Sequence, residues 1–501
     1  MKQKLRSSRH ATTELILIKQ VKHKKPDLLF LDVEMPAIAP WTEDQQQRVK
    51  EQEKIQMFRP FLYSMIVALA APITAGVEGA TLNGKAVAAR MDNYLRPYVA
   101  VKDFSGVVLV AQGDKVLYEK AYGSTDPIHE KPNRTSTAFR IASLSKTFTA
   151  AAISILAEQG KLSLEDPLSR FLPDFPNAKS ITIKLLLRHE SGVGQLHSPE
   201  TLRDCFSTAE LVHRIAEVPP LFAPGTSGQY SNEGYILLAA VVEAVSGMDY
   251  ELFLRQHIFE PLKMEHTGTM CNKWPAIDHS NGSTAGFDGG VAPLPFEQAG
   301  WNGPGSVYST ADDLLTWLRA LAENRIFRFD QLAYPYGWGK RNYSGRELVE
   351  QSGELNGYNA HMALYPKERI YFIFLSNIQS GMFNRLPRDF EAVTFGGTPS
   401  TPPLANRVSK SEQKLSEYVG AYTTPAVPMP LSLEEKDGHL WMHWGEDVFE
   451  RPLLMTGKDE FYLRSQYCKI LFERDPQGEI VRSVWQWGDN SPLVLTKKAQ
   501  P

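Results

Sequence analysis

Residues 139–150 read Phe139-Arg140-Ile141-Ala142-Ser143-Leu144-Ser145-Lys146-Thr147-Phe148-Thr149-Ala150, with a serine three residues before a lysine. Small and apolar residues continue to position 156, and Gly160 is a typical helix-ending residue. The pattern predicts that an irregular segment becomes a buried helix at this serine. Because three residues are close to one helical turn, Ser143 Oγ and Lys146 Nζ can meet on one face of that helix.

Ser143 and Lys146 are residue types that can act together as a nucleophile and its base. A serine hydroxyl is a weak nucleophile until a base takes its proton. A lysine held partly out of water loses proton affinity, and it can then act as that base or assist another one. The alternative is that Ser143 only caps a helix whose Lys146 is solvated. We predict the catalytic role.

Composition limits the class of protein. The chain has 501 residues, of which 43% are hydrophobic and 22% charged, as in soluble globular proteins with more than one domain. The formal charge of -3 gives no reason to expect nucleic acid as a partner. The cysteines are odd in number and far apart, so we expect buried free thiols and neither a disulfide framework nor a zinc site. They are Cys205, Cys271 and Cys468.

Residues 1–56 differ from the rest of the chain. Residues 25–36 form a buried-strand pattern that ends in Asp32-Val33-Glu34-Met35-Pro36. The pattern resembles the central strand of a response-regulator receiver domain, with Asp32 at the phospho-accepting position. The acidic pair that such a domain needs upstream is missing, because Glu14 is the only acid before Asp27. We interpret residues 1–56 as a receiver-like fragment and a polar linker without phosphorylation chemistry. Phospho-signalling through Asp32 is the competing hypothesis.

Residues 57–80 have the features of a leader sequence with a second possible start at Met57. Met57-Phe58-Arg59 is followed by an apolar run over residues 61–71 and by Ile73-Thr74-Ala75. These are the parts of a secretory signal, and the run is short for a membrane span, which needs about 20 residues. We predict a signal peptide or an uncleaved anchor. The protein is then exported, periplasmic or membrane-anchored if Met57 is the start, and cytoplasmic if it is not. A buried helix of the next domain is the alternative.

A second polar motif, Tyr230-Ser231-Asn232, lies in a loop before an apolar helix that we predict over residues 234–246. Tyr230 and Asn232 are two positions apart, so in an extended loop their side chains point the same way. A phenol and a carboxamide that face a lysine can pass protons and hold a substrate amide. Upstream, a turn at Gly113-Asp114 predicts a hairpin of strands at residues 104–110 and 116–121.

The third motif is Gln351-Ser352-Gly353, which precedes predicted strands at residues 359–365 and 370–377. The three motifs together resemble the serine β-lactamase and penicillin-binding-protein superfamily. The Tyr-x-Asn form is similar to the branch of class C β-lactamases, esterases and D-amino-acid peptidases. The resemblance covers roughly residues 104–377. For residues 81–395 it implies an α/β (α+β) fold of the β-lactamase/transpeptidase type, an antiparallel sheet flanked by helices with a helical subdomain.

The resemblance also implies a role for each site residue. Ser143 attacks a carbonyl, a Lys146–Tyr230 pair takes its proton, and Asn232 orients the substrate. The backbone N–H groups of Ser143 and Glu354 would hold the oxyanion. This mechanism requires no metal and no organic cofactor.

Gln351 departs from the superfamily pattern, which has lysine or histidine at this position. Glutamine donates a hydrogen bond but carries no charge. We expect residues 351–354 to bind substrate, and the missing charge puts β-lactam recognition in question more than acyl transfer. His361 and His266 are candidates for the missing imidazole, whereas we expect His189 to be structural.

Residues 396–405 have the composition of a linker, and residues 406–501 predict a small all-β barrel or sandwich. The predicted strands are short and rich in aromatic and β-branched residues. They lie at residues 418–423, 431–435, 440–444, 461–463, 470–474, 481–486 and 493–496. The arrangement resembles the lipocalin-like β-domain that often follows such hydrolase domains. We expect Trp441 and Trp444 to pack in its core, with a ligand cavity as the alternative.

These observations predict a serine hydrolase that forms an acyl-enzyme through Ser143 on an ester or an amide, as an esterase, D-amino peptidase or β-lactamase-like enzyme. The competing hypothesis is a catalytically impaired binding or scaffold protein, because Gln351 replaces the usual lysine or histidine. The expected partner is a small-molecule or peptide substrate, with no nucleic acid. Association with a membrane or cell wall and the oligomeric state stay open.

Overall fold

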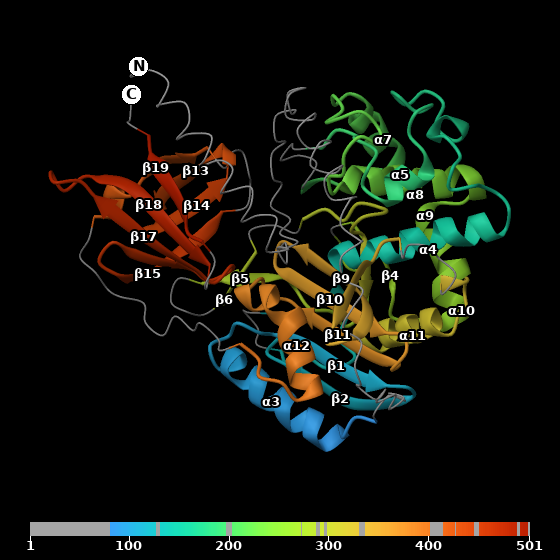
Figure 1. Ribbon diagram of the computed structural model, residues 1–501, viewed down its shortest axis with the longest axis horizontal. Helices are drawn as coiled ribbons and strands as arrows, with labels where there is room; N and C mark the ends of the chain where they lie inside the picture. The colour runs from blue at the N-terminus through green and yellow to red at the C-terminus, as the bar shows by residue number, and fades with distance from the viewer. Residues whose placement is uncertain are drawn as a thin grey trace, which may run out of the picture.

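The computed structural model describes residues 81–126, 131–196, 203–271, 273–286, 291–294, 298–329, 336–400, 414–425, 427–444, 450–487 and 491–498. The receiver-like fragment, the leader-like segment and residues 401–405 of the expected linker lie outside these ranges. Within them, no helix has both the length and the apolar character that crossing a membrane requires. Figure 1 shows an α/β unit, coloured from blue to orange, beside a β-barrel drawn in red.

The α/β unit is built on a six-stranded sheet with the order β2-β1-β11-β10-β9-β8, in which every neighbouring pair is antiparallel. Its strands are β1 (Gly106–Gln112), β2 (Lys115–Tyr122), β8 (Gly339–Tyr343), β9 (Arg346–Leu355), β10 (Tyr358–Tyr365) and β11 (Ile370–Ser376). Strands β1 and β11 are buried on both faces, as their continuous apolar sequences predict. The two hairpins expected from the sequence, β1-β2 and β10-β11, are both present.

Alternate side chains of the sheet contribute to two separate cores. One core lies between the sheet and helices α4, α8 and α11, and the other lies between the opposite face and helices α3 and α12. On β10, for example, Met362 belongs to the first core and Tyr365 to the second. Figure 1 shows α3 and α12 on one side of the sheet and α4 on the other. These helices are α3 (Gly84–Ala100), α4 (Ser145–Glu158), α8 (Asn232–Ser246), α11 (Ala311–Ala322) and α12 (Leu386–Phe395).

Shorter elements complete the α/β unit. Helices α5, α7 and α9 pack against α8 and form the predicted helical subdomain. Two small sheets have the orders β3-β7-β4 and β5-β6. The bounds are α5 (Ile183–Leu187), α7 (Thr208–Ala216), α9 (Tyr250–Leu254), α10 (Glu260–Leu262), β3 (Phe139–Arg140), β4 (Gly268–Thr269), β5 (Ser283–Ala285), β6 (Val291–Pro293) and β7 (Val307–Ser309). The 3-10 helices are η1 (Ala142–Leu144), η2 (Leu168–Arg170), η5 (Gly381–Asn384) and η6 (Leu415–Glu417), and η3 (Arg255–Phe259) is a π-helical turn.

The prediction of three free thiols was wrong for two of the cysteines. Cys205 and Cys271, which are 66 positions apart in sequence, form a disulfide with 5.8 Å between their Cα atoms. The pairing was invisible in the sequence because the segments that precede α7 and follow β4 meet only in the folded chain. Cys468 is a buried free thiol, as expected.

The C-terminal strands close into an eight-stranded antiparallel barrel, β12 to β19. The bounds are β12 (Gly420–Thr424), β13 (Val427–Lys436), β14 (His439–Trp444), β15 (Arg451–Gly457), β16 (Glu460–Leu463), β17 (Cys468–Arg474), β18 (Ile480–Trp487) and β19 (Leu493–Lys497). The sequence analysis missed only β15, whose second residue is Pro452, a residue type that is unusual within strands. The barrel and the antiparallel sheet with its helices confirm the predicted fold class.

The barrel interior is filled by apolar side chains. Leu440 and Met442 of β14 point into this core, so Trp441 between them lies on the outer face and is only partly buried. The expectation that Trp441 packs in the core was therefore wrong. The side chain of Trp444 lies outside the described part of the structure.

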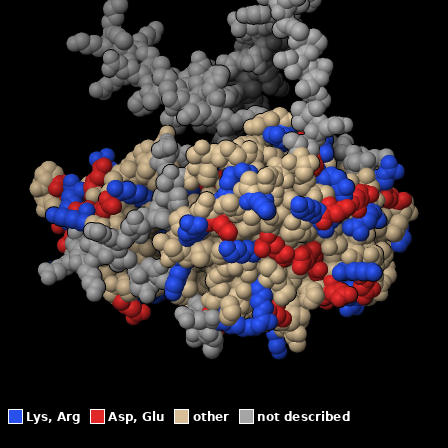
Figure 2. Space-filling model, turned by 90° about the horizontal axis from the view of Figure 1, so that it is seen from below, with Lys and Arg blue, Asp and Glu red and all other residues tan. Residues whose placement is uncertain are grey.

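On the face that Figure 2 shows, the described Lys and Arg side chains are interspersed with Asp and Glu.

Candidate active site

The predicted nucleophile lies where the short helix η1 passes into α4. Ala142 has a left-handed backbone with φ 49°, which turns the chain just before Ser143. Ser143 is 7% exposed, and Lys146, in the first turn of α4, is fully buried. Val307 N donates to Ser145 Oγ at 3.0 Å, which ties the start of α4 to β7. The serine is thus held at a buried helix start whose position is fixed.

The Lys146 side-chain nitrogen contacts three oxygen atoms. This Nζ donates to Ser143 Oγ at 3.1 Å, to Asn232 Oδ1 at 2.7 Å and to the Pro304 carbonyl oxygen at 3.4 Å. It also lies 4.6 Å from the centre of the Tyr230 ring. A buried side-chain nitrogen needs such partners, because a polar group that is removed from water without hydrogen bonds destabilises the fold. The contact between Ser143 and Lys146 predicted from their spacing is present.

Tyr230 completes the cluster, because its hydroxyl oxygen lies 2.7 Å from Ser143 Oγ. Ser231 is the N-cap of α8, and its Oγ accepts a hydrogen bond from Gly234 N at 2.9 Å. The cap places Tyr230 just outside the helix and Asn232 as its first residue, so both side chains reach the Ser143–Lys146 pair. The Ser143 hydroxyl therefore lies within hydrogen-bond reach of Lys146 and Tyr230, which together can take its proton when the pair is one proton short.

Strand β9 forms a wall of the site next to η1. Gln351 Nε2 donates to the Ser143 carbonyl oxygen at 3.3 Å, so this glutamine holds the main chain of the nucleophile. A Cβ atom at position 353 would overlap the Ile141 carbonyl oxygen and would lie 2.9 Å from Ser143 N. Gly353 thus permits an approach to η1 that a side chain would block. Both Gln351 and Gly353 face η1, since side chains two positions apart on a strand share a face.

Ser352 and Glu354 lie on the other face of β9. Ser352 Oγ is 2.9 Å from Nδ1 of His361, its direct partner on β10. Burial lowers the pKa of His361 to about 4, although the neighbouring Glu350 carboxylate acts in the opposite direction. The Glu354 carboxylate contacts Gln379 Nε2. His361 therefore contacts Ser352 on the face of β9 that points away from η1, and it does not lie beside Ser143.

An ionic cluster lies next to His361. Arg341 of β8 pairs with Glu350 of β9 at 2.8 Å and with Glu391 of α12 at 2.8 Å. Tyr365 OH donates to Glu391 Oε1 at 2.8 Å, and His361 Nε2 lies 3.8 Å from Glu350 Oε2. Burial raises the pKa of Glu391, and Arg341 partly offsets that rise. The cluster connects β8, β9 and β10 to α12, and so it supports the strand that carries the third motif.

The structure brings most of the predicted site residues around Ser143. The side chains of Ser352 and Glu354 point away from η1. His266 lies in a separate network, in which its backbone N–H donates to Asp313 Oδ2 at 2.9 Å. The residues gathered around the nucleophile are Lys146, Tyr230, Asn232, Gln351 and Gly353. Within the described ranges, no group of three or more His, Cys, Asp and Glu side chains could hold a metal ion.

Sequence reasoning missed two contributions to the site. The Pro304 carbonyl, a partner of Lys146, comes from the glycine-rich turn Gly303-Pro304-Gly305, and nothing in the sequence of that turn indicated a contact with the lysine. His189 was expected to be structural, and its ring centre lies 4.7 Å from that of Tyr230. In the sequence, His189 stands before Glu190-Ser191-Gly192, a turn pattern that indicated a structural residue and no chemical role.

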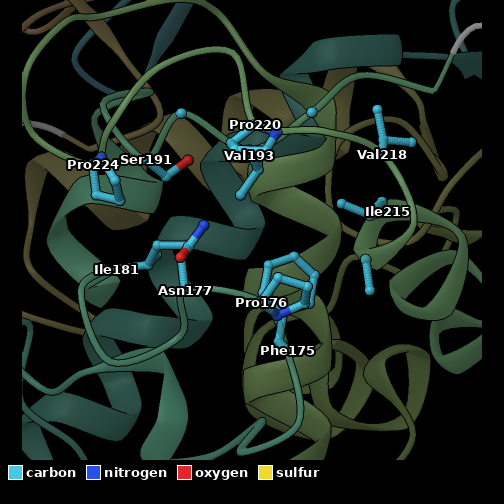
Figure 3. A pocket seen from close by; sticks show the side chains of 13 residues that line it. Phe175, Pro176, Asn177, Ile181, Ser191, Val193, Ile215, Val218, Pro220 and Pro224 are labelled. Carbon is cyan, nitrogen blue, oxygen red and sulfur yellow. The ribbon is translucent and has the colours of Figure 1, made fainter.

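A small, mostly apolar crevice lies beside the segment that follows His189 (Figure 3). Its walls include Phe175, Val193, Ile215 and the buried Ser191. None of its lining residues is a predicted site residue. The crevice therefore belongs to the scaffold of the helical subdomain rather than to the cluster around the nucleophile.

The buried lysine, the serine beside it and the tyrosine before α8 define the class of protein to which this chain belongs. The sequence profile of the family described as Beta-lactamase matches residues 91–393, which is more than half of the chain. The chain is a member of this family of serine hydrolases, which includes esterases.

Individual relatives are similar to this chain over the same region. Penicillin-binding protein 4* of Bacillus subtilis (strain 168) is 30% identical over 364 residues, which cover 64% of this chain and 79% of that protein. Esterase EstB of Burkholderia gladioli is 30% identical over 294 residues, or 50% of this chain and 74% of that protein. The crystal structure of a penicillin binding protein from Bacillus halodurans superposes with a TM-score of 0.54 at 28% identity and covers 60% of this chain and 99% of its own.

Proposed function

We propose that this protein is a serine hydrolase that forms an acyl-enzyme through Ser143 on an ester or an amide. The observation that carries the proposal is the pair of contacts of Ser143 Oγ, 2.7 Å from the Tyr230 hydroxyl and 3.1 Å from Lys146 Nζ. When the Lys146–Tyr230 pair is one proton short, as an amine beside a phenol or an ammonium beside a phenolate, it can accept the serine proton as Ser143 Oγ attacks.

The proposed reaction begins when Ser143 Oγ attacks the substrate carbonyl carbon and its proton passes to the Lys146–Tyr230 pair. The two groups titrate together, so the proton affinity belongs to the pair. The backbone N–H groups of Ser143 and Glu354 stabilise the oxyanion, and one such donor contributes about 10²–10³-fold in rate. The pair then protonates the leaving group. In the second half, it takes a proton from the water that attacks the acyl-enzyme. Asn232 holds Lys146 and orients the substrate.

An ester is the substrate class that we propose first. Similarity to EstB supports an ester, and similarity to penicillin-binding protein 4* supports a D-amino peptide as the second candidate. The third motif, Gln351-Ser352-Gly353, has no cationic side chain, and Gln351 uses its amide on the Ser143 carbonyl. A substrate that requires a positive charge from this motif, as a β-lactam would by family resemblance, is therefore a weaker candidate.

The test combines a covalent probe with turnover. A fluorophosphonate should label Ser143, and the full chain should hydrolyse a short-chain p-nitrophenyl ester with an initial burst, with nitrocefin measured alongside. Ser143→Ala should abolish labelling and hydrolysis. Ser411→Ala, in the other Ser-x-x-Lys sequence of the chain, should change neither. Undiminished turnover by Ser143→Ala would refute the proposal.

The same experiment tests the competing hypothesis of an impaired binding protein. If the missing charge at Gln351 blocks deacylation, the burst will equal one product per enzyme and no steady turnover will follow. Gln351→His should then restore turnover, because it returns an imidazole to the third motif. Steady turnover by the wild-type protein would exclude the scaffold hypothesis.

We also propose that the protein is exported. The Cys205–Cys271 disulfide supports export, because disulfides persist in oxidising compartments and are rare in the cytosol. The leader-like residues 57–80 would supply the signal. Cell fractionation followed by N-terminal sequencing of the mature protein is the test. A cytoplasmic product with an intact leader and reduced thiols would contradict the proposal.

A further inference from the structure

His189 lies directly beside the tyrosine that we assign to proton transfer. It follows α5 with a left-handed backbone, φ 59°, which is uncommon for residues other than glycine. Its ring centre is 4.7 Å from that of Tyr230 and 5.2 Å from that of Tyr235. The imidazole is therefore in contact with two tyrosine rings, one of which belongs to the site.

Two hydrogen bonds to His189 bracket Tyr230 in the sequence. Gln229 N donates to the His189 carbonyl oxygen at 2.9 Å, and Ser231 N donates to His189 Nδ1 at 3.0 Å. The residues before and after Tyr230 are thus bound to one histidine, whose ring also packs on the tyrosine. These three contacts fix both the backbone and the ring of Tyr230 relative to α5.

The imidazole must be neutral to make this arrangement. Nδ1 accepts a hydrogen bond only while it is unprotonated, so the single ring proton is on Nε2. Burial and the nearby Lys146 charge lower the pKa of His189 to about 3. At ordinary pH the acceptor is therefore present, and the ring places no second positive charge beside Lys146.

We propose that His189 is the positioning residue of Tyr230, which it holds against Ser143 Oγ without exchanging a proton itself. The inference rests on the proposed function and adds to it the group that orients the base. Nucleophilic sites commonly have a nucleophile, a base and a third group that orients the base. Here the third group acts through the peptide N–H of Ser231 and through the ring face, so it leaves the Tyr230 hydroxyl to Ser143.

Two substitutions separate these contributions. His189→Asn keeps an acceptor close to Nδ1 and tolerates the left-handed turn, but it removes the ring contact. His189→Phe keeps a ring and leaves the Ser231 N–H without its acceptor. We expect kcat for a p-nitrophenyl ester to fall about 10- to 100-fold in His189→Phe and by a smaller factor in His189→Asn, with KM little changed. The control is His213→Phe on α7, where the side chain is 78% exposed, and its kcat should be that of wild type.

A double-mutant cycle distinguishes positioning from a general structural role. If His189 acts through the Tyr230 hydroxyl, the His189→Asn variant should be labelled by the fluorophosphonate more slowly than the wild type. The double variant His189→Asn/Tyr230→Phe should be labelled at the same rate as Tyr230→Phe alone. Additive effects would overturn the proposal. Unchanged kcat in both His189 variants would overturn it as well. If His189→Phe does not fold, His189→Asn and the cycle still decide the question.

Failure of this inference differs from failure of the proposed function. If only the inference is wrong, Ser143→Ala abolishes turnover while substitutions of His189 leave kcat unchanged. If the proposed function is wrong, Ser143→Ala retains turnover whatever stands at position 189.

Discussion

At the scale of single residues, the proposed chemistry depends on the buried Lys146. Its contact with Ser143 could be predicted from sequence, because residues three apart on a helix are neighbours whatever the rest of the chain does. Its contact with the Pro304 carbonyl could not, because 158 residues separate the two and only the tertiary fold brings them together. The sequence therefore indicated the groups of the proposed reaction but not all the oxygen atoms that contact Lys146 Nζ.

Tyr230→Phe should reduce catalysis without affecting the fold. The substitution removes the hydroxyl that lies 2.7 Å from Ser143 Oγ and keeps the ring that packs on Lys146 and His189. We expect kcat to fall about 10²–10⁴-fold, the usual contribution of a general base, with an unchanged unfolding midpoint. Tyr343→Phe on β8 is the matched control and should keep full activity. Near-normal kcat in Tyr230→Phe would assign the proton to Lys146 alone.

His361 should make the stability of the protein depend on pH. Burial lowers its pKa from 6.5 to about 4. Between these values the unfolded chain binds a proton that the folded chain does not, so stability falls as the pH drops from 6.5 towards 4. At 1.36 kcal/mol per pKa unit, the loss is about 3 kcal/mol. Urea unfolding at pH 7 and pH 5 should show a smaller difference for His361→Asn than for wild type. Equal differences would show that His361 is not buried as a neutral group.

At the scale of elements, strand β9 shows where sequence prediction stopped. The helices α4 and α8 were predicted because their apolar runs are continuous, whereas only the motif at residues 351–353 was recognised within β9. The strand alternates between a face that packs on η1 and a face with Glu350 and Ser352, whose partners lie on β8 and β10. In the sequence alone, the polar residues of β9 are typical of a loop, because their partners on β8 and β10 are visible only in the folded chain. The same reasoning explains β15, where Pro452 concealed the strand.

Gly353→Ala should displace β9 from the nucleophile. The new Cβ would meet the Ile141 carbonyl oxygen and would lie 2.9 Å from Ser143 N, and both are backbone atoms that cannot rotate away. A shift of about 1 Å in a catalytic group can cost about 10²-fold in rate, and we expect kcat/KM to fall by at least that factor. Gly339→Ala on β8 is the control, because its nearest contact is an ordinary 3.5 Å to the Glu350 carbonyl oxygen. Equal activity in the two variants would contradict the assigned role of Gly353.

At the scale of the whole molecule, the barrel and the α/β unit share a core. Leu454, Tyr462 and Tyr467 of the barrel belong to the same apolar cluster as α3 and α12. Tyr467 stacks on Tyr98 of α3 with ring centres 6.5 Å apart, and its OH donates to Asp103 Oδ2 at 2.8 Å. The sequence predicted both parts but not their contact, because the residues that join them have no periodicity of their own.

Arg464→Met should weaken this junction. Arg464, 4% exposed, pairs with Asp103, 3% exposed, and donates to the Val101 carbonyl oxygen at 2.5 Å. Breaking a buried ion pair leaves an uncompensated charge, and burial already raises the pKa of Asp103. We expect the free energy of unfolding to fall by about 3–5 kcal/mol. Ester hydrolysis and total tryptophan fluorescence should change in one transition in the wild type. In the variant the fluorescence should change in two steps, because Trp485 lies in the barrel and Trp317 in the α/β unit.

The control for Arg464→Met is Arg482→Met in the same barrel, where the arginine and its partner Glu473 are 53% and 45% exposed. An exposed pair contributes about 0–1 kcal/mol, so this variant should unfold close to wild type. Asp103→Asn added to Arg464→Met should recover part of the loss, because a neutral amide is less costly to bury than an unpaired carboxylate. If Arg464→Met unfolds in a single transition at the wild-type midpoint, the junction is held by the tyrosine and leucine contacts alone.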